Sequence, residues 1–496
     1  MTATTHLGAD LKAKIVGEAV SRAVHVLCFL YIARALGANR FGELSLALTV
    51  GQLAGFLLLD PGLNTAMVRR LIRAPAGGAL RAGVTLGWKV CLAAPMFAVL
   101  AAAAAVPAAR LPQPQLLLLA GSYALALALL DWVCAITNAY SRLDLEARIR
   151  IGSRLGMVAV AVLADWTQST AGVLAAMAGI TAVAAAAGWM SVARHCLRAT
   201  PRWSWDEARQ ALAEGLPVAC ATWLTGVYQR WDLLFLSAFQ VSYEAQGWYA
   251  AAYRIFEMLS AAPVILSVAA FPSLVRLHQG DRKGFEELVV LGLKSAVTAA
   301  TAAALITAAF SAVIMSLLYG PAYGGGAAAL EVLGWGAVPL FAHLFLLQAN
   351  VARGGAGVNV WCGAGALLAG LVANVLLIPR LGMLGVAWGS LAAHATFTVL
   401  AVAAMSRRAP GYALLRAVWG LTLACGAAAW LVYAARLPAG ARLALGIVVY
   451  TSVLLGGRIL TLEEARQAVR LLRGQHPSGN QPANAGPEAP ARGDLP

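Results

Sequence analysis

Residues 116–138 read LLLLAGSYALALALLDWVCAITN, an apolar run in which Asp131 is the single charged residue. A helix needs about 20 mostly apolar residues to cross the hydrocarbon core of a bilayer, so this run can span a membrane as one helix. The same length criterion predicts about fourteen spans, near residues 15–36, 43–64, 84–106, 116–138, 149–165, 171–193, 214–239, 247–275, 288–318, 327–351, 358–378, 382–405, 412–434 and 442–460. These runs predict an all-α polytopic membrane protein.

The composition of the 496-residue chain agrees with this fold class. Hydrophobic residues make up 60% of the chain, charged residues make up 12%, and the mean hydropathy is +0.73. Soluble proteins carry about 25% charged residues, so the composition excludes a soluble enzyme and a disordered protein. The seven cysteines lie in apolar runs and form no CxxC pair, so neither a disulfide framework nor a zinc site is indicated.

The positive charges are unevenly distributed among the predicted loops, and the net charge is +15. The fifth, seventh and ninth loops hold no Lys or Arg, whereas most positive residues lie in the second, fourth, sixth, eighth and twelfth loops. Positive residues stay on the cytoplasmic side, so we expect both termini to be cytoplasmic and the number of spans to be even. Orientation accounts for most of the charge, and no nucleic-acid partner is needed. These residues are Arg69, Arg70, Arg73 and Arg81; Arg142, Arg148 and Arg150; Arg194, Arg198, Arg202 and Arg209; Arg276, Arg282 and Lys283; and Arg407 and Arg408.

Two halves of the chain carry similar motifs in the same order. The sequence ARALGANRFGELSLALTV at 33–50 is matched by LSAFQVSYEAQGWYAAAYRI at 236–255. The matched segments are six spans apart, so each pair crosses the membrane in the same direction. This is the parallel-repeat plan of many transporters. The repeat predicts two six-helix lobes, whereas chance similarity between Ala-, Gly- and Leu-rich segments is the alternative. The matched pairs are Gly42 with Gly247, Arg69 with Arg276, and Gly172 with Gly385.

This repeat divides the chain into five predicted regions. The first lobe covers residues 1–200 and the second covers 201–408. Two extra transmembrane helices follow at 409–460, and charged residues 461–475 predict a helix on the cytoplasmic surface. The tail at 476–496 is rich in Pro, Gly, Asn and Ala, a composition that is typical of disorder.

Ionisable residues inside spans are the default indication of a functional cavity. In the first span Glu18, Arg22 and His25 are spaced i, i+4 and i+7, which places them on one helix face. They can line a cavity between the lobes. The alternative is an ion pair of Glu18 with Arg22 that extends to the cytoplasmic interface.

A second group of ionisable residues lies in the seventh and eighth spans. Arg230 and Asp232 belong to the seventh, and Arg254 and Glu257 belong to the eighth. At 1.5 Å per residue, both arginines lie about 12–15 Å from the outer ends of their helices. They can form a cationic patch whose arginines are held by carboxylates until an anion arrives. The alternative is a structural, mutually neutralised pair between neighbouring helices.

Other polar residues give weaker signals. Asp131 is in the middle of a span and can titrate, whereas Asp60 in the sequence DPGLN has the surroundings of a turn or cap residue. The chain has no HExxH, Walker or GxSxG motif. We therefore predict neither a catalytic constellation nor a metal site or cofactor.

The sequence ARALGANRFGELSLALTVGQLAGFLLLDPGLNTAMVRRL at 33–71 resembles the opening of Wzx-type polysaccharide and O-antigen flippases. These are members of the multidrug/oligosaccharidyl-lipid/polysaccharide (MOP) exporter superfamily. The resemblance covers about residues 10 to 405 and is loose in residue identity but specific in motif order. In the second lobe it rests on Asp232, GWYAAAYRI at 247–255, FPSL at 271–274, LLYGPAY at 317–323 and NVLLIPRLGMLGVAWGS at 374–390.

The resemblance implies a two-lobed fold with a V-shaped central cavity and the flipping of undecaprenyl-diphosphate-linked glycans to the outer leaflet. In such flippases cavity arginines are thought to meet the diphosphate, and Arg22, Arg230 and Arg254 match that description in type and depth. Glu18, His25, Asp131, Asp232 and Glu257 are candidates for ion pairing or coupling. The last two helices depart from the usual twelve spans and resemble the extra pair of lipid II flippases.

The expected partners are therefore a polyprenyl-diphosphate-linked glycan, membrane lipids, a coupling ion (H⁺ or Na⁺) and glycan-assembly proteins. Arg outnumbers Lys and Ala is abundant, which indicates a GC-rich bacterial source and the bacterial plasma membrane. A cation-coupled multidrug exporter of the same superfamily is the main alternative, but it needs a predominantly acidic cavity. A membrane glycosyltransferase or glycan polymerase normally carries a larger outward loop or a cytoplasmic domain, and a pure scaffold leaves the intramembrane charges unexplained.

Overall fold

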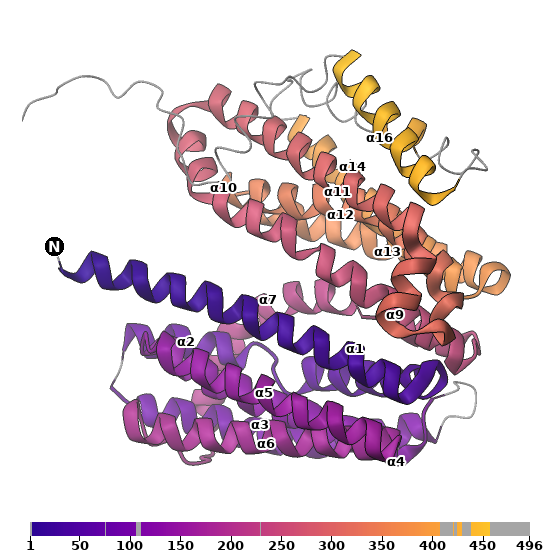
Figure 1. Ribbon diagram of the computed structural model, residues 1–496. Coiled ribbons are helices and arrows are strands. Elements are labelled where there is room, and N and C mark those ends of the chain that lie inside the picture. The colour runs from indigo at the N-terminus through magenta and orange to yellow at the C-terminus, as the bar shows by residue number, and fades with distance from the viewer. Residues whose placement is uncertain are drawn as a thin grey trace, which may run out of the picture.

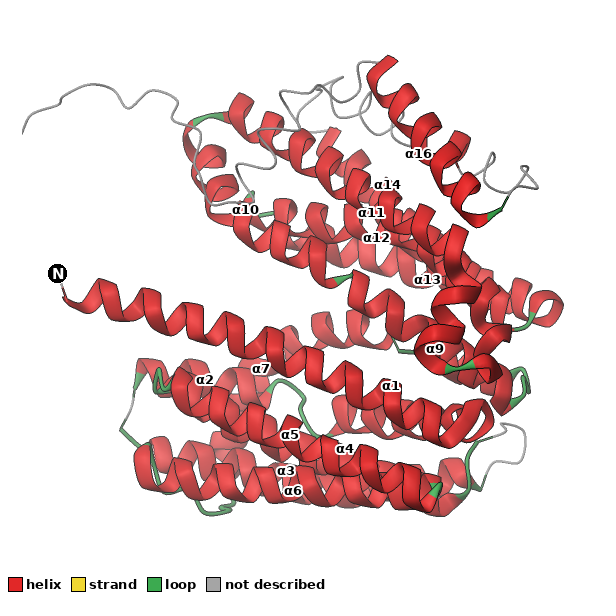
Figure 2. Cartoon of the chain, viewed as in Figure 1, coloured by secondary structure: helices red, strands yellow, loops and turns green. Residues whose placement is uncertain are grey.

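The structure is a computed structural model that describes residues 2–74, 76–105, 111–228, 230–406, 420, 424–428 and 438–456. In the first turns of the chain, up to residue 23, it describes the helix but not the side chains. Within this described part every regular element is a helix (Figure 2). The elements are α1 (Thr2–Leu58), α2 (Leu63–Arg73), α3 (Gly78–Ala104), α4 (Pro114–Ala139), α5 (Leu143–Thr167), α6 (Thr170–His195), α7 (Trp205–Tyr228), α8 (Asp232–Ala238), α9 (Tyr243–Leu259), α10 (Ala261–Gly280), α11 (Arg282–Tyr319), the 3₁₀ helix η1 (Pro321–Gly326), α12 (Ala327–Ala352), α13 (Ala356–Leu381), α14 (Met383–Ser406) and α16 (Ala439–Gly456).

The predicted all-α membrane fold is confirmed. In the described part of the chain, 8 helices are long and apolar enough to cross a membrane, so the protein is a multi-pass membrane protein. Several predicted spans match closely: the run at 327–351 is α12, and the run at 382–405 is α14. The thirteenth predicted span lies mostly outside the described residues. The predicted surface helix and disordered tail lie wholly outside them.

Three predicted boundaries differ from the structure. The first two predicted spans form one element, α1, which is divided only by a kink at Gly37 with φ 73° and ψ 167°. Glycine alone adopts such a positive φ without strain, so one residue replaces the expected loop. The seventh predicted span is two helices, α7 and α8, and the eighth falls across α9 and α10. Pro263 explains the second break, because it cannot donate a hydrogen bond to the carbonyl four residues earlier.

The helices form two groups that meet where α1 of the first group packs against α9 of the second (Figure 1). In the first group α4 packs against α6, and α1 packs against α4 and α5. In the second group α13 packs against α14, and α12 packs against both α11 and α14. The contact between α1 and α9 is the largest between the groups.

Two glycines from the predicted repeat meet at this contact. A Cβ atom on Gly42 would lie 1.8 Å from the carbonyl oxygen of Tyr243, and one on Gly247 would lie 1.9 Å from that of Ala38. The two backbones therefore touch, which only glycine permits. Gly42 and Gly247 are the first pair matched in the sequence repeat. The contact agrees with the sequence match, and the two-lobe repeat stays a prediction.

Helix α7 packs on the first group although the sequence repeat places it at the start of the second lobe. It contacts α2 most extensively and also α3, with a further contact to α13 of the second group, and Trp223 donates its indole N–H to the carbonyl of Phe56 at 3.1 Å. The short helix α8, beyond the break at 230–231, contacts α1 of the first group and also α14 and α9 of the second. After the break in the seventh predicted span the chain therefore lies between the two groups.

Candidate functional site

A chain of side-chain contacts links the two groups of helices through α1. Arg154 of α5 donates a hydrogen bond from Nη1 to Nδ1 of His25 at 2.8 Å. His25 packs edge-on against Phe29, one turn further along α1, with ring centroids 4.7 Å apart. The guanidinium of Arg254 on α9 lies 4.6 Å from the Phe29 ring centroid, within the range of a cation–π contact. Two arginines from opposite groups thus flank one face of α1.

Arg254 is held by an acidic residue of its own helix. Its Nη1 donates to Oε2 of Glu257 at 3.0 Å. The two side chains are 33% and 49% exposed, so this is a partly solvated ion pair, which contributes about 1 kcal/mol or less. Solvent therefore reaches the Arg254 guanidinium, and another anion can compete with Glu257 for it.

Arg230 lies at the break between α7 and α8. Its exposed side chain donates from Nη1 to the amide oxygen of Gln52 on α1 at 2.5 Å. The nearby Asp232 does not belong to the same contact. Its buried carboxylate instead accepts hydrogen bonds from the hydroxyl groups of Tyr249 and Ser390, the latter at 3.0 Å. The predicted patch therefore separates into an exposed arginine and a buried acid.

Three arginines of the site contribute to the electrostatic field at the same buried residue. Arg154, Arg230 and Arg254 all contribute to the electrostatic field at the hydroxyl group of Tyr123, a buried residue of α4. Among the residues whose side chains the structure describes, Glu257 is the carboxylate that pairs with these arginines; Arg154 and Arg230 donate to neutral groups. Asp131 also contributes to the field at this hydroxyl group. Among the described side chains positive charge therefore exceeds negative charge here by number, and we call Arg154, Arg230 and Arg254 the arginine cluster.

Two of the predicted site residues are described only as part of a helix. Glu18 and Arg22 belong to α1, and their side chains lie outside the described residues. Arg22 precedes His25 by three residues, which places the two on the same helix face. The structure therefore leaves their predicted roles as predictions.

Asp131 makes its ion pair with an arginine outside the arginine cluster. Its carboxylate on α4 is 3.7 Å from Nη2 of Arg150 on α5, and Arg150 also donates to Glu146 at 3.0 Å. Asp60 is a turn residue, as predicted, because its Oδ1 accepts the N–H of Asn64 at 3.1 Å. Acidic residues outnumber basic ones in the network around Arg150, because Asp131 and Glu146 share this arginine.

Sequence reasoning missed two cations inside spans, the half-buried Arg154 and the fully buried Lys89. Both lie inside apolar runs, and a charged residue inside a span was the signal that could have identified them. Their partners are distant in the chain: Arg154 contacts His25, and Lys89 lies 3.5 Å from a carboxylate oxygen of Asp60. Only folding brings these residues together.

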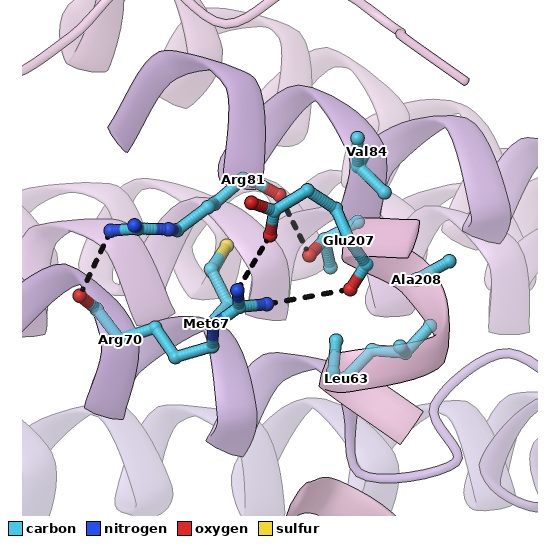
Figure 3. Close-up of a pocket in the computed structure, with 9 residues that line it drawn as sticks. Leu63, Met67, Arg70, Arg81, Val84, Glu207 and Ala208 are labelled. Carbon is cyan, nitrogen blue, oxygen red and sulfur yellow. Dashed lines mark hydrogen bonds and ion pairs between the residues drawn. The ribbon is translucent and has the colours of Figure 1, made fainter. Parts of the chain in front are cut away.

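A small pocket lies between α2, α3 and α7, away from the arginine cluster (Figure 3). Its Arg70 is 2.7 Å from Oε2 of Glu207 and donates to the side-chain oxygen of Gln210 at 2.8 Å. These interactions attach α7 to α2, and Glu207 neutralises the charge of Arg70. In the described part of the chain no group of three or more His, Cys, Asp or Glu residues could hold a metal ion.

The fold resembles three solved structures. The chain superposes on the lipid II flippase MurJ in an inward closed conformation with a TM-score of 0.69 and 12% identity, covering 90% of this chain and 100% of that one. An inward-facing multidrug resistance MATE family transporter of the MOP superfamily gives 0.56 and 17%, covering 78% and 96%. A MOP superfamily transporter from Pyrococcus furiosus, described by a reverse polarity of its binding pocket, gives 0.53 and 15%, covering 78% and 92%.

The sequence comparisons identify the family. No curated protein matches the chain. The family model described as polysaccharide biosynthesis protein matches residues 10–278, which is more than half of the 496 residues. The likeness to the solved structures shows that the fold is that of the MOP superfamily, as the sequence resemblance implied. With this match and this fold, the protein is a member of the polysaccharide biosynthesis protein family.

Proposed function

We propose that the protein is a flippase. It moves a polyprenyl-diphosphate-linked oligosaccharide, or a related polysaccharide precursor, from the inner to the outer leaflet of the bacterial plasma membrane by alternating access, with both termini in the cytoplasm. The observation that carries this proposal is the excess of positive charge in the arginine cluster, which both helix groups supply. The family match and the shared fold support a transporter for a polysaccharide precursor.

The physical problem of such a substrate is its diphosphate. A diphosphate carries about two negative charges, and an unpaired ion in hydrocarbon costs tens of kcal/mol by Born solvation. Guanidinium groups lower this cost because they stay charged and bind phosphate oxygens through a planar fork of N–H donors. The lipid tail can stay in the bilayer throughout.

The arginines have distinct roles in this mechanism. Arg22, Arg230 and Arg254 bind the headgroup. Arg154 adds a fourth positive charge, and its hydrogen bond to His25 fixes the position of its guanidinium group. On binding, the diphosphate replaces Glu257 at Arg254 and Gln52 at Arg230. Because Arg154 and Arg254 belong to different helix groups, one anion bound between them favours a particular arrangement of the two groups. No covalent step is needed, so the protein acts as a transporter rather than an enzyme.

A coupling ion, H⁺ or Na⁺, resets the conformation in this proposal. Among the predicted candidates, Asp232 suits this role better than Asp131 or Glu257, which lie beside the guanidinium groups of Arg150 and Arg254. Asp232 is buried and its bonds to Tyr249 and Ser390 come from neutral hydroxyl groups. Glycan-assembly proteins are expected partners on either side of the membrane.

The test is binding of undecaprenyl diphosphate to the purified protein, together with glycan export in cells. We expect Arg230→Ala and Arg254→Ala each to weaken binding by about tenfold or more and to abolish export, while the protein still inserts into the membrane. Arg22→Ala is expected to do the same. Arg254→Lys should retain part of the binding, because the charge stays while the fork is lost.

Arg148→Ala is the matched control, because Arg148 is exposed at the start of α5 and outside the cluster. It should leave binding and export unchanged. Normal export in Arg22→Ala, Arg230→Ala and Arg254→Ala alike would contradict the proposal. A multidrug exporter is the other outcome: resistance to cationic drugs that depends on the protein, without binding of undecaprenyl diphosphate, would establish it.

A further inference from the structure

A lysine is fully buried in the first helix group, outside the arginine cluster. Lys89 lies on α3, and its side chain is 0% exposed. Its Nζ donates a hydrogen bond to the carbonyl oxygen of Leu59 at 3.1 Å and lies 3.5 Å from Oδ2 of Asp60. A buried ammonium is expensive unless oxygen atoms surround it, so these two oxygens are the reason it is tolerated.

Both oxygens come from the short connection between two helices, directly after the end of α1. Helix α1 ends at Leu58, and α2 begins at Leu63. The last carbonyl groups of a helix lack partners within the helix and carry partial negative charge. Asp60 adds a full negative charge at the same place. Carbonyl and carboxylate oxygens at an interrupted membrane helix are the kind of ligand set that coordinates a monovalent cation in transporters.

We propose that the break between α1 and α2 is a cation site whose cation is the ammonium group of Lys89, supplied by the chain itself. The site takes a monovalent cation, and the tethered ammonium fills it permanently. The first helix group therefore needs no exchangeable ion at this break. This inference concerns the stability of the helix group and does not depend on the transport function proposed above.

The surroundings explain why the cation is a lysine. Asp60 and Asp131 both contribute to the electrostatic field at the ammonium group. The positive charge of Lys89 therefore interacts with two acidic residues of the first group. Arg150 lies on the far side of Asp131, at 3.7 Å. The side chain of Asp60 is 29% exposed, so a small molecule from solvent can reach the site once the lysine side chain is shortened.

Chemical rescue tests the proposal. Lys89→Ala removes three methylene groups and the ammonium, which together correspond to n-propylammonium. We expect the substitution to lower the apparent melting temperature of the purified full-length protein by about 5 °C or more. Added n-propylammonium chloride should restore at least half of that loss. The neutral analogue 1-propanol should restore little, because it fills the volume without the charge.

Leu86→Ala is the matched control. Leu86 is a buried apolar residue one turn earlier on the same helix, so its truncation leaves a space without the cation ligands. Propylammonium should not stabilise this variant or the unmodified protein. Equal rescue of Lys89→Ala by 1-propanol, or no rescue by propylammonium, would overturn the proposal.

A second pair of variants covers the case in which Lys89→Ala does not fold. Lys89→Met leaves the carboxylate of Asp60 without its cation, whereas Lys89→Met combined with Asp60→Asn removes both charges. We expect the double variant to melt at a higher temperature than Lys89→Met alone, because no buried charge is left uncompensated. A double variant that is no more stable than Lys89→Met would contradict the proposal that Lys89 is the cation of this site. Export assays are not needed for this test, so its failure is distinguishable from failure of the proposed flippase function.

Discussion

The two groups of helices hold their acidic residues in different ways. In the first group the acids have cationic partners: Asp60 lies 3.5 Å from Lys89, and Glu146 accepts a hydrogen bond from Arg150 at 3.0 Å. In the second group Asp232 is 6% exposed and accepts hydrogen bonds from the hydroxyl groups of Tyr249 and Ser390.

This difference indicates which group is fixed and which can change its charge. A carboxylate beside a tethered cation stays ionised, because protonation of the carboxylate would leave the buried cation without a counter-ion. A carboxylate held by neutral hydroxyl groups can take up a proton or a metal cation without such a penalty. The first group is therefore suited to a constant scaffold, and the second is suited to respond to an ion.

The largest expected effect tests the fixed group. Arg150→Met removes the cation from Glu146, whose side chain is 7% exposed, and from Asp131. We expect the free energy of unfolding to fall by about 3 kcal/mol, because a buried charge loses its partner. Thermal unfolding in detergent measures it. Arg148→Met, at an exposed position two residues away, should change the free energy by less than about 0.5 kcal/mol. Equal losses in both variants would remove the distinction between the groups.

A smaller effect is expected at the hydroxyl groups of the second group. Tyr249→Phe removes one donor to the buried Asp232 and leaves Ser390 in place. The net loss of one hydrogen bond to a charged group is about 1.5–3 kcal/mol, and an uncharged acid loses less. We expect about 1–2 kcal/mol by thermal unfolding. A loss as large as that of Arg150→Met would show that Asp232 is as firmly fixed as the acids of the first group.

Asp232→Asn should separate stability from ion response. The amide oxygen can still accept hydrogen bonds from Tyr249 and Ser390, so we expect a change of about 1 kcal/mol or less in the free energy of unfolding. Dependence of export on a Na⁺ or proton gradient should disappear in this variant. Asp131→Asn is the comparison in the first group. Export that keeps its gradient dependence in Asp232→Asn would place the coupling ion elsewhere.

The smallest effect concerns an exposed ion pair, which shows that burial matters more than pairing alone. Arg142 donates to Asp144 at 3.1 Å at the start of α5. The Arg142 guanidinium holds the pKa of the Asp144 carboxyl below its ordinary value. A lowered pKa contributes stability above the pKa of the unfolded state, about 3.9, and that contribution is lost as the pH falls through the folded pKa. Because solvent screens the pair, Asp144→Asn should leave the melting temperature at neutral pH unchanged within error. A clear decrease would contradict this ranking.

Much of the fold could be predicted because helix insertion depends on local properties. The apolar run at 327–351 became α12 almost residue for residue, and the repeat placed Gly42 opposite Gly247 in the sequence before the structure placed them in contact. The helix breaks near Arg230 and Ser260 were missed. A single interruption does not lower the mean hydropathy of a run enough to divide it.

The candidate site was only partly predictable. Arg230, Arg254 and Glu257 were identified because a charge within an apolar run is conspicuous. Their partners could not be read from the sequence: Gln52 is 178 residues from Arg230, and Asp232 was expected beside the arginines but bonds to hydroxyl groups instead. Arg154 was overlooked because nothing in its own segment relates it to His25, which is 129 residues away.

The sequence by itself determined that this chain is a multi-pass helical membrane protein with charged residues inside its spans, and it predicted an internal repeat. Tertiary structure alone decided which of those charges are neutralised and which remain available. The reason is physical. The free energy of inserting a helix is a sum over neighbouring side chains, whereas the free energy of a buried charge depends on the few atoms within hydrogen-bonding distance, and those atoms come from distant parts of the chain.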